Sequence, residues 1–510
     1  MSSKVTTNIG KTNCDIFTSI DVVKYMLDLS GYKPDIDLSK VRVIEPSCGD
    51  GEFVVEIVER LIKSSKLYNF DVNIAIDSLL ICYDTDIEKI EATIRRVESL
   101  PYNISLKRDN FRCEDFLLAG DCVADLIIGN PPYIRHEQID AEKKVLYKKL
   151  YSTFRYRADI YIPFFEKSLK SLAPNGTHCF ICSNRWLKNQ YGKLLRGEIS
   201  ASYNLKQIIN LESVNPFQKR VVAYPAITLI ENRESQKHFK YAKIDDINHL
   251  QEVDVKSEKR VIVKNDEWSD AFNPIKQNSN LLTIEEMGFK VGIGVATGAD
   301  SVFIGEELVD YIEKELLLPI ILSKDINCTS VNWSGKYLFN PFDNRGNIID
   351  LEKYPKANLY LLSHKSRLQS RHIAKRNPNY WYRTIDKIDP LLLSMPKILL
   401  PDISNNRYVT IDNGEYYPHH NMYYITGSDN CNLTLLSAIL MSDFVSSQLR
   451  NLSNVMNGGY PRWQSQYIKK LRVPNIFSLD EENRGALLDN YRTNNLSKIN
   501  SIVNLATSSI

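Results

Sequence analysis

The chain has no long hydrophobic run and few cysteines, and these two absences narrow its class. Its longest apolar stretches, such as residues 316–322, are much shorter than the roughly 20 residues that cross a membrane. The nine cysteines follow no regular spacing, and the first residues do not resemble a signal peptide. Both features are typical of a reducing compartment. We therefore expect a cytoplasmic protein that does not bind a membrane.

Metal-ligand spacing is also missing from the sequence. Cys179 and Cys182 form a C-x-x-C pair, but the pair lies within an apolar strand pattern and no second Cys or His pair accompanies it. The adjacent His419 and His420 also lack further ligands at the spacing of zinc sites. The sequence therefore predicts no metal site.

A proline loop after an apolar strand is the strongest functional signal. Residues 125–129 read Asp-Leu-Ile-Ile-Gly, which predicts a buried strand, and Asn130-Pro131-Pro132-Tyr133 follow at its carboxyl end. Open α/β sheets bind their ligands at this end of their strands. The loop is thus a candidate site, although N-P-P is also a good ordinary turn.

The residue types in this loop fit one chemical task closely. An amino group on a planar ring is a poor nucleophile, because its lone pair is delocalised into the ring. The Asn130 side-chain oxygen and the Pro131 carbonyl can accept both N–H bonds and localise that lone pair. Pro131 and Pro132 restrict the backbone, and the Tyr133 ring offers a face for stacking a flat base. The pattern favours methylation of an amino nitrogen.

A strand, a glycine turn and a helix precede this loop. Residues 41–44 read Val-Arg-Val-Ile, residues 45–51 read Glu-Pro-Ser-Cys-Gly-Asp-Gly, and apolar residues at helical spacing follow. This is the first unit of a Rossmann-like sheet, in which glycines let the backbone approach a ligand. A single Gly-x-Gly with an Asp beside it argues against NAD and for a ligand with an ammonium or sulfonium group. An ordinary tight turn is the alternative.

Two further acids follow predicted strands. Residues 79–83 end at Asp84, where a carboxylate can bind both ribose hydroxyls of a nucleoside. Helix capping is the alternative role, and Asp86 could cap while Asp84 binds. Asp115 and Phe116 follow a third strand end, where the carboxylate could accept from an adenine amino group while the ring covers the base. A solvated surface acid is the alternative at Asp115.

The order of these segments resembles the γ class of DNA adenine-N6 methyltransferases, the TaqI-like enzymes. In that class an S-adenosylmethionine-binding half precedes the N-P-P-Y half, and a target-recognition domain follows. The resemblance is strong over residues 15–235 and more diffuse over 285–475. It implies an α/β fold, with a Rossmann-like methyltransferase domain followed by a mixed α/β target-recognition domain. It also implies S-adenosylmethionine as cofactor and double-stranded DNA as substrate.

The resemblance carries roles onto matching positions. Residues 130–133 match the catalytic loop, and Phe217 falls where the family has a second aromatic residue for the extruded base. Thr18 begins a segment that resembles the family's opening helix, and Thr18-x-x-Asp21 also has the form of an N-terminal cap. The expected cofactor-binding residues are Thr18, Glu45, Cys48, Gly49, Gly51, Asp84, Asp115 and Phe116.

The net charge of +2 hides an uneven distribution. Residues 1–130 carry 15 basic and 22 acidic residues, whereas residues 143–157 carry six basic residues and no acid. Residues 353–407 carry eleven basic and three acidic residues. Basic stretches of this kind can clamp a polyanion, although charge runs are often only solvated faces.

A length of 510 residues suits two or three domains. We expect a catalytic domain over 1–240, a polar connecting segment over 241–284, a target-recognition domain over 285–475 and a tail over 476–510. Residues 291–298 superficially resemble a dinucleotide-binding loop. No acid-tipped strand follows them, so a glycine-rich β turn is the preferred interpretation.

Together these features predict a site-specific DNA methyltransferase that flips an adenine out of the duplex and methylates its N6. We expect it to be a monomer and the modification enzyme of a restriction–modification system, with a separately encoded restriction endonuclease as a candidate partner. Two other interpretations stay open: a methyltransferase of a protein glutamine or of RNA, and a non-catalytic specificity subunit. The large C-terminal half favours DNA, and the presence of Asn130, Asp84 and Gly49 favours catalysis.

Overall fold

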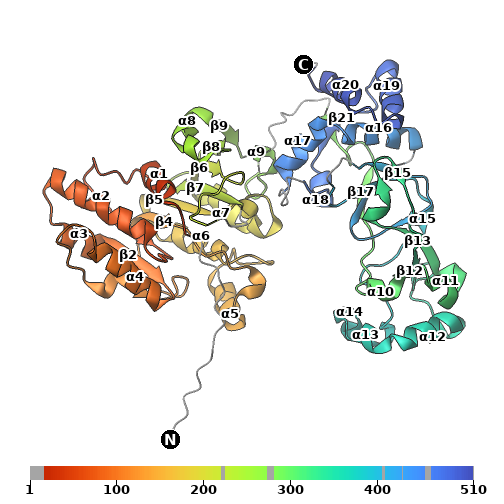
Figure 1. Ribbon diagram of the computed structural model, residues 1–510, viewed down its shortest axis with the longest axis horizontal. Helices are drawn as coiled ribbons and strands as arrows, with labels where there is room; N and C mark the ends of the chain where they lie inside the picture. Colours follow the sequence, from red (N-terminus) through yellow and green to blue (C-terminus); the bar gives the residue numbers. More distant parts are fainter. Residues whose placement is uncertain are drawn as a thin grey trace, which may run out of the picture. The chain divides into compact units, whose positions relative to one another are not determined.

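Nine strands from the first half of the chain form one sheet in the described residues (Figure 1). Their order is β3-β2-β1-β4-β5-β7-β6-β8-β9. The first five strands in this order are parallel, and β7 runs antiparallel between β5 and β6. The strands are β1 (Val43–Glu45), β2 (Leu80–Asp84), β3 (Phe111–Cys113), β4 (Ala124–Gly129), β5 (Leu172–Ser183), β6 (Asn204–Asn210), β7 (Pro225–Glu231), β8 (His238–Lys243) and β9 (Glu258–Val261).

The computed structural model describes residues 17–219, 224–262, 264–272, 281–404, 408–427, 429–453 and 461–508. The chain divides into two compact units, Met1–Phe272 and Asn273–Ile510. Residues 220–223, shortly after Phe217, lie outside the described residues.

Helices cover both faces of the large sheet, because side chains alternate along each strand. Val43, Leu126 and Ile128 pack into a core with α1, α2, α3 and α4. Ile44 and Ile127 face the opposite core, with α5, α6 and α7. The helices are α1 (Ile20–Leu29), α2 (Glu52–Tyr68), α3 (Val72–Leu79), α4 (Ile87–Glu98), α5 (Ala141–Leu150), α6 (Tyr161–Lys170), α7 (Lys193–Ser202), α8 (Val253–Lys256) and α9 (Ser269–Phe272). The predicted α/β class is confirmed.

The first unit extends past residue 240, where we placed its end. β8 pairs with β6, β9 pairs with β8, and Trp268 is fully buried in the core with its ring centroid 5.7 Å from that of Trp186. The polar composition of this segment comes from edge strands and loops, which expose most of their side chains. A few large apolar residues are enough to attach it to the sheet.

The second unit is built on several small sheets rather than one large one. In the described part of this unit, two sheets have four strands, in the orders β11-β20-β17-β18 and β12-β16-β13-β19, and two have two strands, β10-β21 and β14-β15. The strands are β10 (Leu281–Thr283), β11 (Lys290–Ile293), β12 (Ile304–Gly305), β13 (Leu317–Ile321), β14 (Ile326–Asn327), β15 (Ser330–Val331), β16 (Tyr337–Phe339), β17 (Lys397–Pro401), β18 (Thr410–Asp412), β19 (Tyr417–Pro418), β20 (Met422–Thr426) and β21 (Arg472–Pro474). Residues 290–293, within the glycine-rich segment, form a strand that pairs with β20.

Helices accompany each of the larger sheets. The helices are α10 (Asp300–Phe303), α11 (Leu308–Tyr311), α12 (Pro355–Ser363), α13 (Lys365–Gln369), α14 (His372–Arg376), α15 (Leu391–Ser394), α16 (Asn430–Leu440), α17 (Asp443–Leu452), α18 (Ser465–Ile468), α19 (Glu481–Arg492) and α20 (Leu496–Ser508). Within the predicted tail, Leu487, Tyr491, Ile499 and Val503 are buried in the same core as α16 and α17, so α19 and α20 belong to the second unit. No helix of the described residues has the length and apolar character needed to cross a membrane.

Candidate active site

Three neighbouring strands bring the predicted residues together. β2, β1 and β4 are adjacent and parallel, so Asp84, Glu45 and the loop after Gly129 meet at one edge of the sheet. The chain order reverses between β1 and β4, which is where such sheets bind ligands. A pocket that is open to solvent lies here. Its lining residues are Phe17, Thr18, Ser47, Cys48, Gly49, Glu52, Phe53, Asp84, Lys89, Asn130, Pro131, Pro132 and Tyr133.

Asp84 connects the end of β2 to the glycine turn. Its Oδ2 accepts a hydrogen bond from the Gly49 amide at 3.0 Å, and its Oδ1 accepts one from the Asp86 amide at 3.0 Å. Burial raises the pKa of the Asp84 carboxyl, and these two hydrogen bonds oppose the rise. Asp86, not Asp84, caps α4 by accepting from the Glu88 amide. Asp84 is therefore available to the pocket.

The glycine turn has a backbone that only glycine adopts easily. Gly49 has φ +53° and Gly51 has φ +90°. A Cβ at Gly51 would also lie 2.9 Å from the Thr93 side chain, so α4 packs directly on the start of α2. The Thr93 hydroxyl donates to the Gly49 carbonyl at 2.9 Å, and the Cys48 amide donates to the Tyr83 carbonyl at 2.8 Å. The turn is thus held from both sides.

The N-P-P-Y loop is held against the glycine turn. The Ser47 hydroxyl donates to the Asn130 backbone carbonyl at 3.0 Å. Pro131 is buried, and the Tyr133 ring meets the Phe217 ring edge to face, with centroids 6.1 Å apart and an interplanar angle of 84°. Phe217 is buried and does not line the pocket, so it supports Tyr133 from behind.

Thr18 reaches the pocket through the segment before α1. Residues 17–19 pair with residues 216–218, where the Ser19 amide donates to the Pro216 carbonyl at 2.9 Å. Thr18 is buried, and its hydroxyl has no hydrogen-bond partner among the described residues. The predicted cap at Thr18-x-x-Asp21 is wrong, because Ser19 is the N-cap and no side chain caps α1. This frees the Thr18 hydroxyl for a ligand.

Glu45 is buried beside the pocket rather than on its surface. Neither carboxylate oxygen has a hydrogen-bond partner in the described part of the chain. Burial, and then the nearby charge of Asp84, raise the pKa of the Glu45 carboxyl well above its usual range. The carboxylate lies under Gly129, where a Cβ would be 2.2 Å from Glu45 Oε1. An unpaired acid in this position favours a cationic group nearby.

Asp115 and Phe116 are not brought into the pocket. The Asp115 Oδ2 accepts hydrogen bonds from the Lys143 ammonium at 2.8 Å and from the Tyr147 hydroxyl at 2.6 Å. The Phe116 ring is fully buried between Tyr83 and Phe164, with centroid distances of 5.3 and 5.6 Å. In this structure the pair serves packing at the end of β3 and contacts with α5.

Five lining residues were absent from the sequence prediction: Phe17, Ser47, Glu52, Phe53 and Lys89. Ser47 lies inside the predicted glycine turn, so its position in the loop was a usable signal. Phe17 approaches Gly49 from a distant segment, 3.4 Å from where a Cβ would be, and no local pattern indicates that contact.

Part of the basic stretch 353–407 is structural. Arg371 donates four hydrogen bonds to backbone carbonyls, those of Leu368, Thr297, Trp381 and Arg383, at 2.8–3.1 Å. Burial lowers the pKa of Arg371 to about 10. Lys397 is fully buried and pairs with Asp412 at 2.6 Å. Arg371 is thus half-buried and engaged with the backbone and Lys397 is enclosed, whereas Lys375 and Arg376 are exposed.

Two family models match the chain. Residues 64–217 match the Eco57I restriction-modification methylase, and residues 318–473 match the TaqI-like C-terminal specificity domain. The first match includes Asp84 and the N-P-P-Y loop, and the second lies within the second unit. The order of the two matches is that of the predicted halves.

Curated relatives match almost the whole chain. The Type II methyltransferase M.PaeR7I of Pseudomonas aeruginosa is 36% identical over 508 residues, which cover 93% of this chain and 88% of the relative. M.XhoI of Xanthomonas vasicola is 34% identical over 496 residues, 90% of each chain. The chain belongs to the Type II methyltransferases of restriction–modification systems. The predicted family is confirmed, and the protein is a DNA methyltransferase of that family.

A solved structure supports the fold of this Type II methyltransferase. The Type IIL restriction-modification enzyme MmeI, determined in complex with DNA, matches with a TM-score of 0.62 at 12% identity. The match covers 96% of this chain and 72% of MmeI. At this identity the likeness concerns the fold, a methylase domain followed by a specificity domain.

Proposed function

We propose that this Type II methyltransferase transfers a methyl group from S-adenosylmethionine to the N6 of an adenine that is rotated out of duplex DNA. One observation carries the proposal. The Asn130-Pro131-Pro132-Tyr133 loop shares a single pocket with Asp84 and Gly49, at the point where the strand order reverses. A base-binding loop and a nucleoside-binding acid are therefore within one site.

Asn130 and Pro131 are proposed to activate the amino group. The Asn130 side-chain oxygen and the Pro131 carbonyl accept its two N–H bonds, which localises the nitrogen lone pair. The Ser47 hydroxyl, which donates to the Asn130 backbone carbonyl, keeps the loop in place before the base arrives. No strong base is required, because the methylated nitrogen is acidic enough to lose its proton to solvent. Positioning and electrostatics supply the rate enhancement.

Tyr133 is proposed to receive the extruded base. Rotating a base out of a duplex requires a few kcal/mol, and stacking on an aromatic ring returns about 1–3 kcal/mol. The edge-to-face contact with the buried Phe217 fixes the orientation of the Tyr133 ring. Phe217 thus acts through Tyr133, a smaller role than the direct base contact expected from the sequence.

The pocket fits S-adenosylmethionine by its donor set. Asp84 lines the pocket and can accept hydrogen bonds from ribose hydroxyls, and the Thr18 hydroxyl, which has no partner among the described residues, lines it too. The Glu45 carboxyl, buried beside the pocket, would be held in its charged form by a cationic amino-acid group of the cofactor. When bound, the cofactor supplies a methyl group that its positive sulfur has already activated, so the chain needs no nucleophile of its own. Gly49 lines the pocket and lets the backbone come close to a ligand, whereas Gly51 allows α4 to pack on the start of α2. Cys48 lines the same turn.

Preference for adenine rests on the TaqI-like resemblance. A cytosine amino group or a glutamine amide presents the same problem to the N-P-P-Y loop. The match of residues 318–473 to a TaqI-like specificity domain supports DNA, and supports adenine because that class methylates it. A separately encoded restriction endonuclease is the proposed partner in the cell.

Product analysis tests this assignment. The purified full-length protein is incubated with unmethylated bacterial DNA and deuterated-methyl S-adenosylmethionine, and the digested nucleosides are separated by mass. We expect the label only in N6-methyldeoxyadenosine. Label in N4-methylcytosine would mean that the enzyme methylates cytosine and not adenine. Label only in added RNA or protein, with none in DNA, would overturn the proposal.

A further inference from the structure

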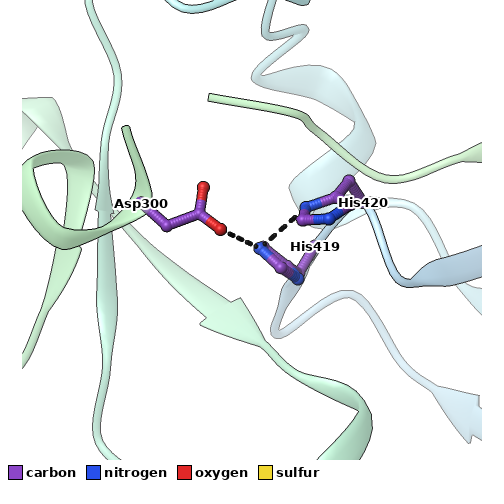
Figure 2. A group of neighbouring side chains, drawn as sticks. All are labelled: Asp300, His419 and His420. Carbon is purple, nitrogen blue, oxygen red and sulfur yellow. Dashed lines mark hydrogen bonds and ion pairs between the residues drawn. The ribbon is translucent and has the colours of Figure 1, made fainter. Parts of the chain in front are cut away.

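Three potential metal ligands converge in the second unit, far from the pocket residues in sequence. Asp300 begins α10, and His419 and His420 lie in the link between β19 and β20 (Figure 2). His419 Nε2 lies 3.1 Å from Asp300 Oδ2 and 3.0 Å from His420 Nδ1. The three ligand atoms all lie within 4.8 Å of one another. The sequence predicted no metal here because Asp300 is 119 residues upstream of His419.

Hydrogen bonding alone serves this cluster poorly. A neutral imidazole carries one N–H, and His419 Nε2 faces a carboxylate oxygen and a second ring nitrogen in different directions (Figure 2). A proton on Nε2 points well at only one of them. If His420 Nδ1 donates to Nε2 instead, the Nε2 lone pair is used and the Asp300 oxygen, on a side chain that is 45% exposed, turns to solvent rather than to His419. A cation satisfies all three electron-rich atoms at once.

The distances are close to those of a coordination sphere. Zinc binds imidazole nitrogen and carboxylate oxygen at about 2.0–2.1 Å, so two ligands of a tetrahedral site lie about 3.3 Å apart. Both contacts of His419 Nε2 are within a few tenths of an ångström of that spacing. The ligand atoms of Asp300 and His420 lie within 4.8 Å of each other, and His420 is exposed and can turn to adjust this distance.

The surrounding structure already orients two of the three ligands. The other Asp300 oxygen, Oδ1, accepts a hydrogen bond from the buried Thr297 hydroxyl. The His419 backbone amide donates to the Ile321 carbonyl at 3.1 Å, and Gly294 fits against the His419 backbone, where a Cβ would be 2.1 Å from its carbonyl oxygen. These contacts fix the Asp300 carboxylate and the His419 backbone, whereas the second ring nitrogen of His419, Nδ1, is buried and has no hydrogen-bond partner among the described residues.

We propose that Asp300, His419 and His420 bind one divalent transition-metal ion of the zinc class, which fastens α10 to the β19–β20 link. Two imidazoles and one carboxylate suit Zn²⁺, Co²⁺ or Ni²⁺, whereas Mg²⁺ and Ca²⁺ take oxygen ligands. The exposed side at His420 leaves room for water as a fourth ligand. The ion has a structural role in the second unit and takes no part in methyl transfer.

Cobalt titration of the full-length protein tests the site. The protein is stripped with a chelator, dialysed and titrated with Co²⁺ alone while its visible absorption is recorded. We expect one ion per chain and at least a tenfold loss of affinity in His420→Ala and in Asp300→Asn. His372→Ala, an exposed histidine of the same unit, is the matched control and keeps wild-type affinity.

Thermal unfolding supplies a second measurement on the same proteins. Zn²⁺ should raise the unfolding temperature of the wild type and of His372→Ala, but not that of His420→Ala. His420 is exposed, so its variant keeps the fold without the ion. The proposal is overturned if the wild type takes up no Co²⁺, or if His420→Ala and Asp300→Asn bind it as the wild type does.

Discussion

The two units of this Type II methyltransferase position their polar side chains by different means. In the first unit, one sheet of nine described strands delivers Asp84 and Asn130 from the ends of parallel neighbours. In the second unit, the Asp300–His419 contact joins a short helix to a link between strands of two different small sheets. In the first unit, the parallel sheet brings together residues from short local motifs. In the second unit, the small sheets bring together residues that belong to no common motif.

The largest expected effect is a loss of methyl transfer in the first unit with no loss of its fold. Asn130→Ala removes the proposed acceptor for the amino group, and we expect methyl transfer to fall by several kcal/mol of transition-state stabilisation. Cofactor and DNA affinity should stay near wild type. Single-turnover transfer of labelled methyl groups measures the loss. Asn103→Ala, an exposed position of the same unit, is the control, and equal rates in the two variants would contradict the mechanism.

The next effect separates binding from capping at the end of β2. Asp84→Ala should weaken S-adenosylmethionine binding by about 1.5–3 kcal/mol, the usual range for hydrogen bonds to a charged group. Asp86→Ala removes the α4 cap that the structure assigns to Asp86, and should reduce stability while leaving that affinity unchanged. Calorimetric titration with the cofactor gives the affinity of each variant. A larger loss of affinity in the Asp86 variant would reverse the two roles.

A buried histidine makes the first unit sensitive to acid. Burial lowers the pKa of His178 to about 3, and the side chain packs against Phe165 and Phe180. Between about pH 6.5 and 3 the unfolded chain binds a proton that the folded chain does not, so stability is lost as the pH falls through this range. His178→Phe should therefore recover about 2 kcal/mol at pH 5 relative to pH 7.5.

Hydrogen exchange followed by mass spectrometry can read this effect in each unit separately. Peptides from the first unit should gain protection at pH 5 in His178→Phe, after correction for the pH dependence of exchange itself. Peptides from the second unit should not change. An equal response in both units would mean that the units unfold together.

The smallest effect concerns the basic stretch of the second unit. Arg371 holds backbone carbonyls, so only exposed residues such as Lys375 and Arg376 can reach phosphates. Each lost phosphate contact should lower the salt slope of DNA binding by about 0.9. Replacing both by Gln should flatten the slope for specific and random duplexes alike, whereas Lys498→Gln, also exposed, should not. An unchanged slope in the double variant would make this stretch only a solvated face.

The sequence was sufficient for the strands β1, β2 and β4, which carry the pocket, because strand, glycine turn and helix signals are local. Residues 125–129 and 79–83 formed strands within one residue of their predicted bounds, and Asp86 capped α4 as one of the alternatives required. Local patterns gave no signal for the contacts of Asp115, whose partners Lys143 and Tyr147 come from a helix about 30 residues later. They also failed for α19 and α20, whose helices carry many polar residues and bury only a narrow apolar face.

Charge counting failed for a related reason. A sum over residues 353–407 treats every basic residue as exposed, but Lys397 is enclosed by Asp412 and three backbone carbonyls. Whether a lysine faces solvent depends on which strand it occupies and on what packs there. Those contacts come from residues distant in sequence.

Substitutions of Gly129 should reduce activity as strongly as substitutions of catalytic residues, although Gly129 has no side chain that could take part in the reaction. Alanine there would place a carbon 2.2 Å from Glu45 Oε1, so either that carboxylate or β4 must move, and Asn130 is the next residue. A screen scored by protection of DNA from cleavage would rank position 129 with the residues that hold the base. Positions 45 and 129 should also covary among relatives. A residue larger than glycine at 129 should occur only where the residue at 45 is smaller than glutamate.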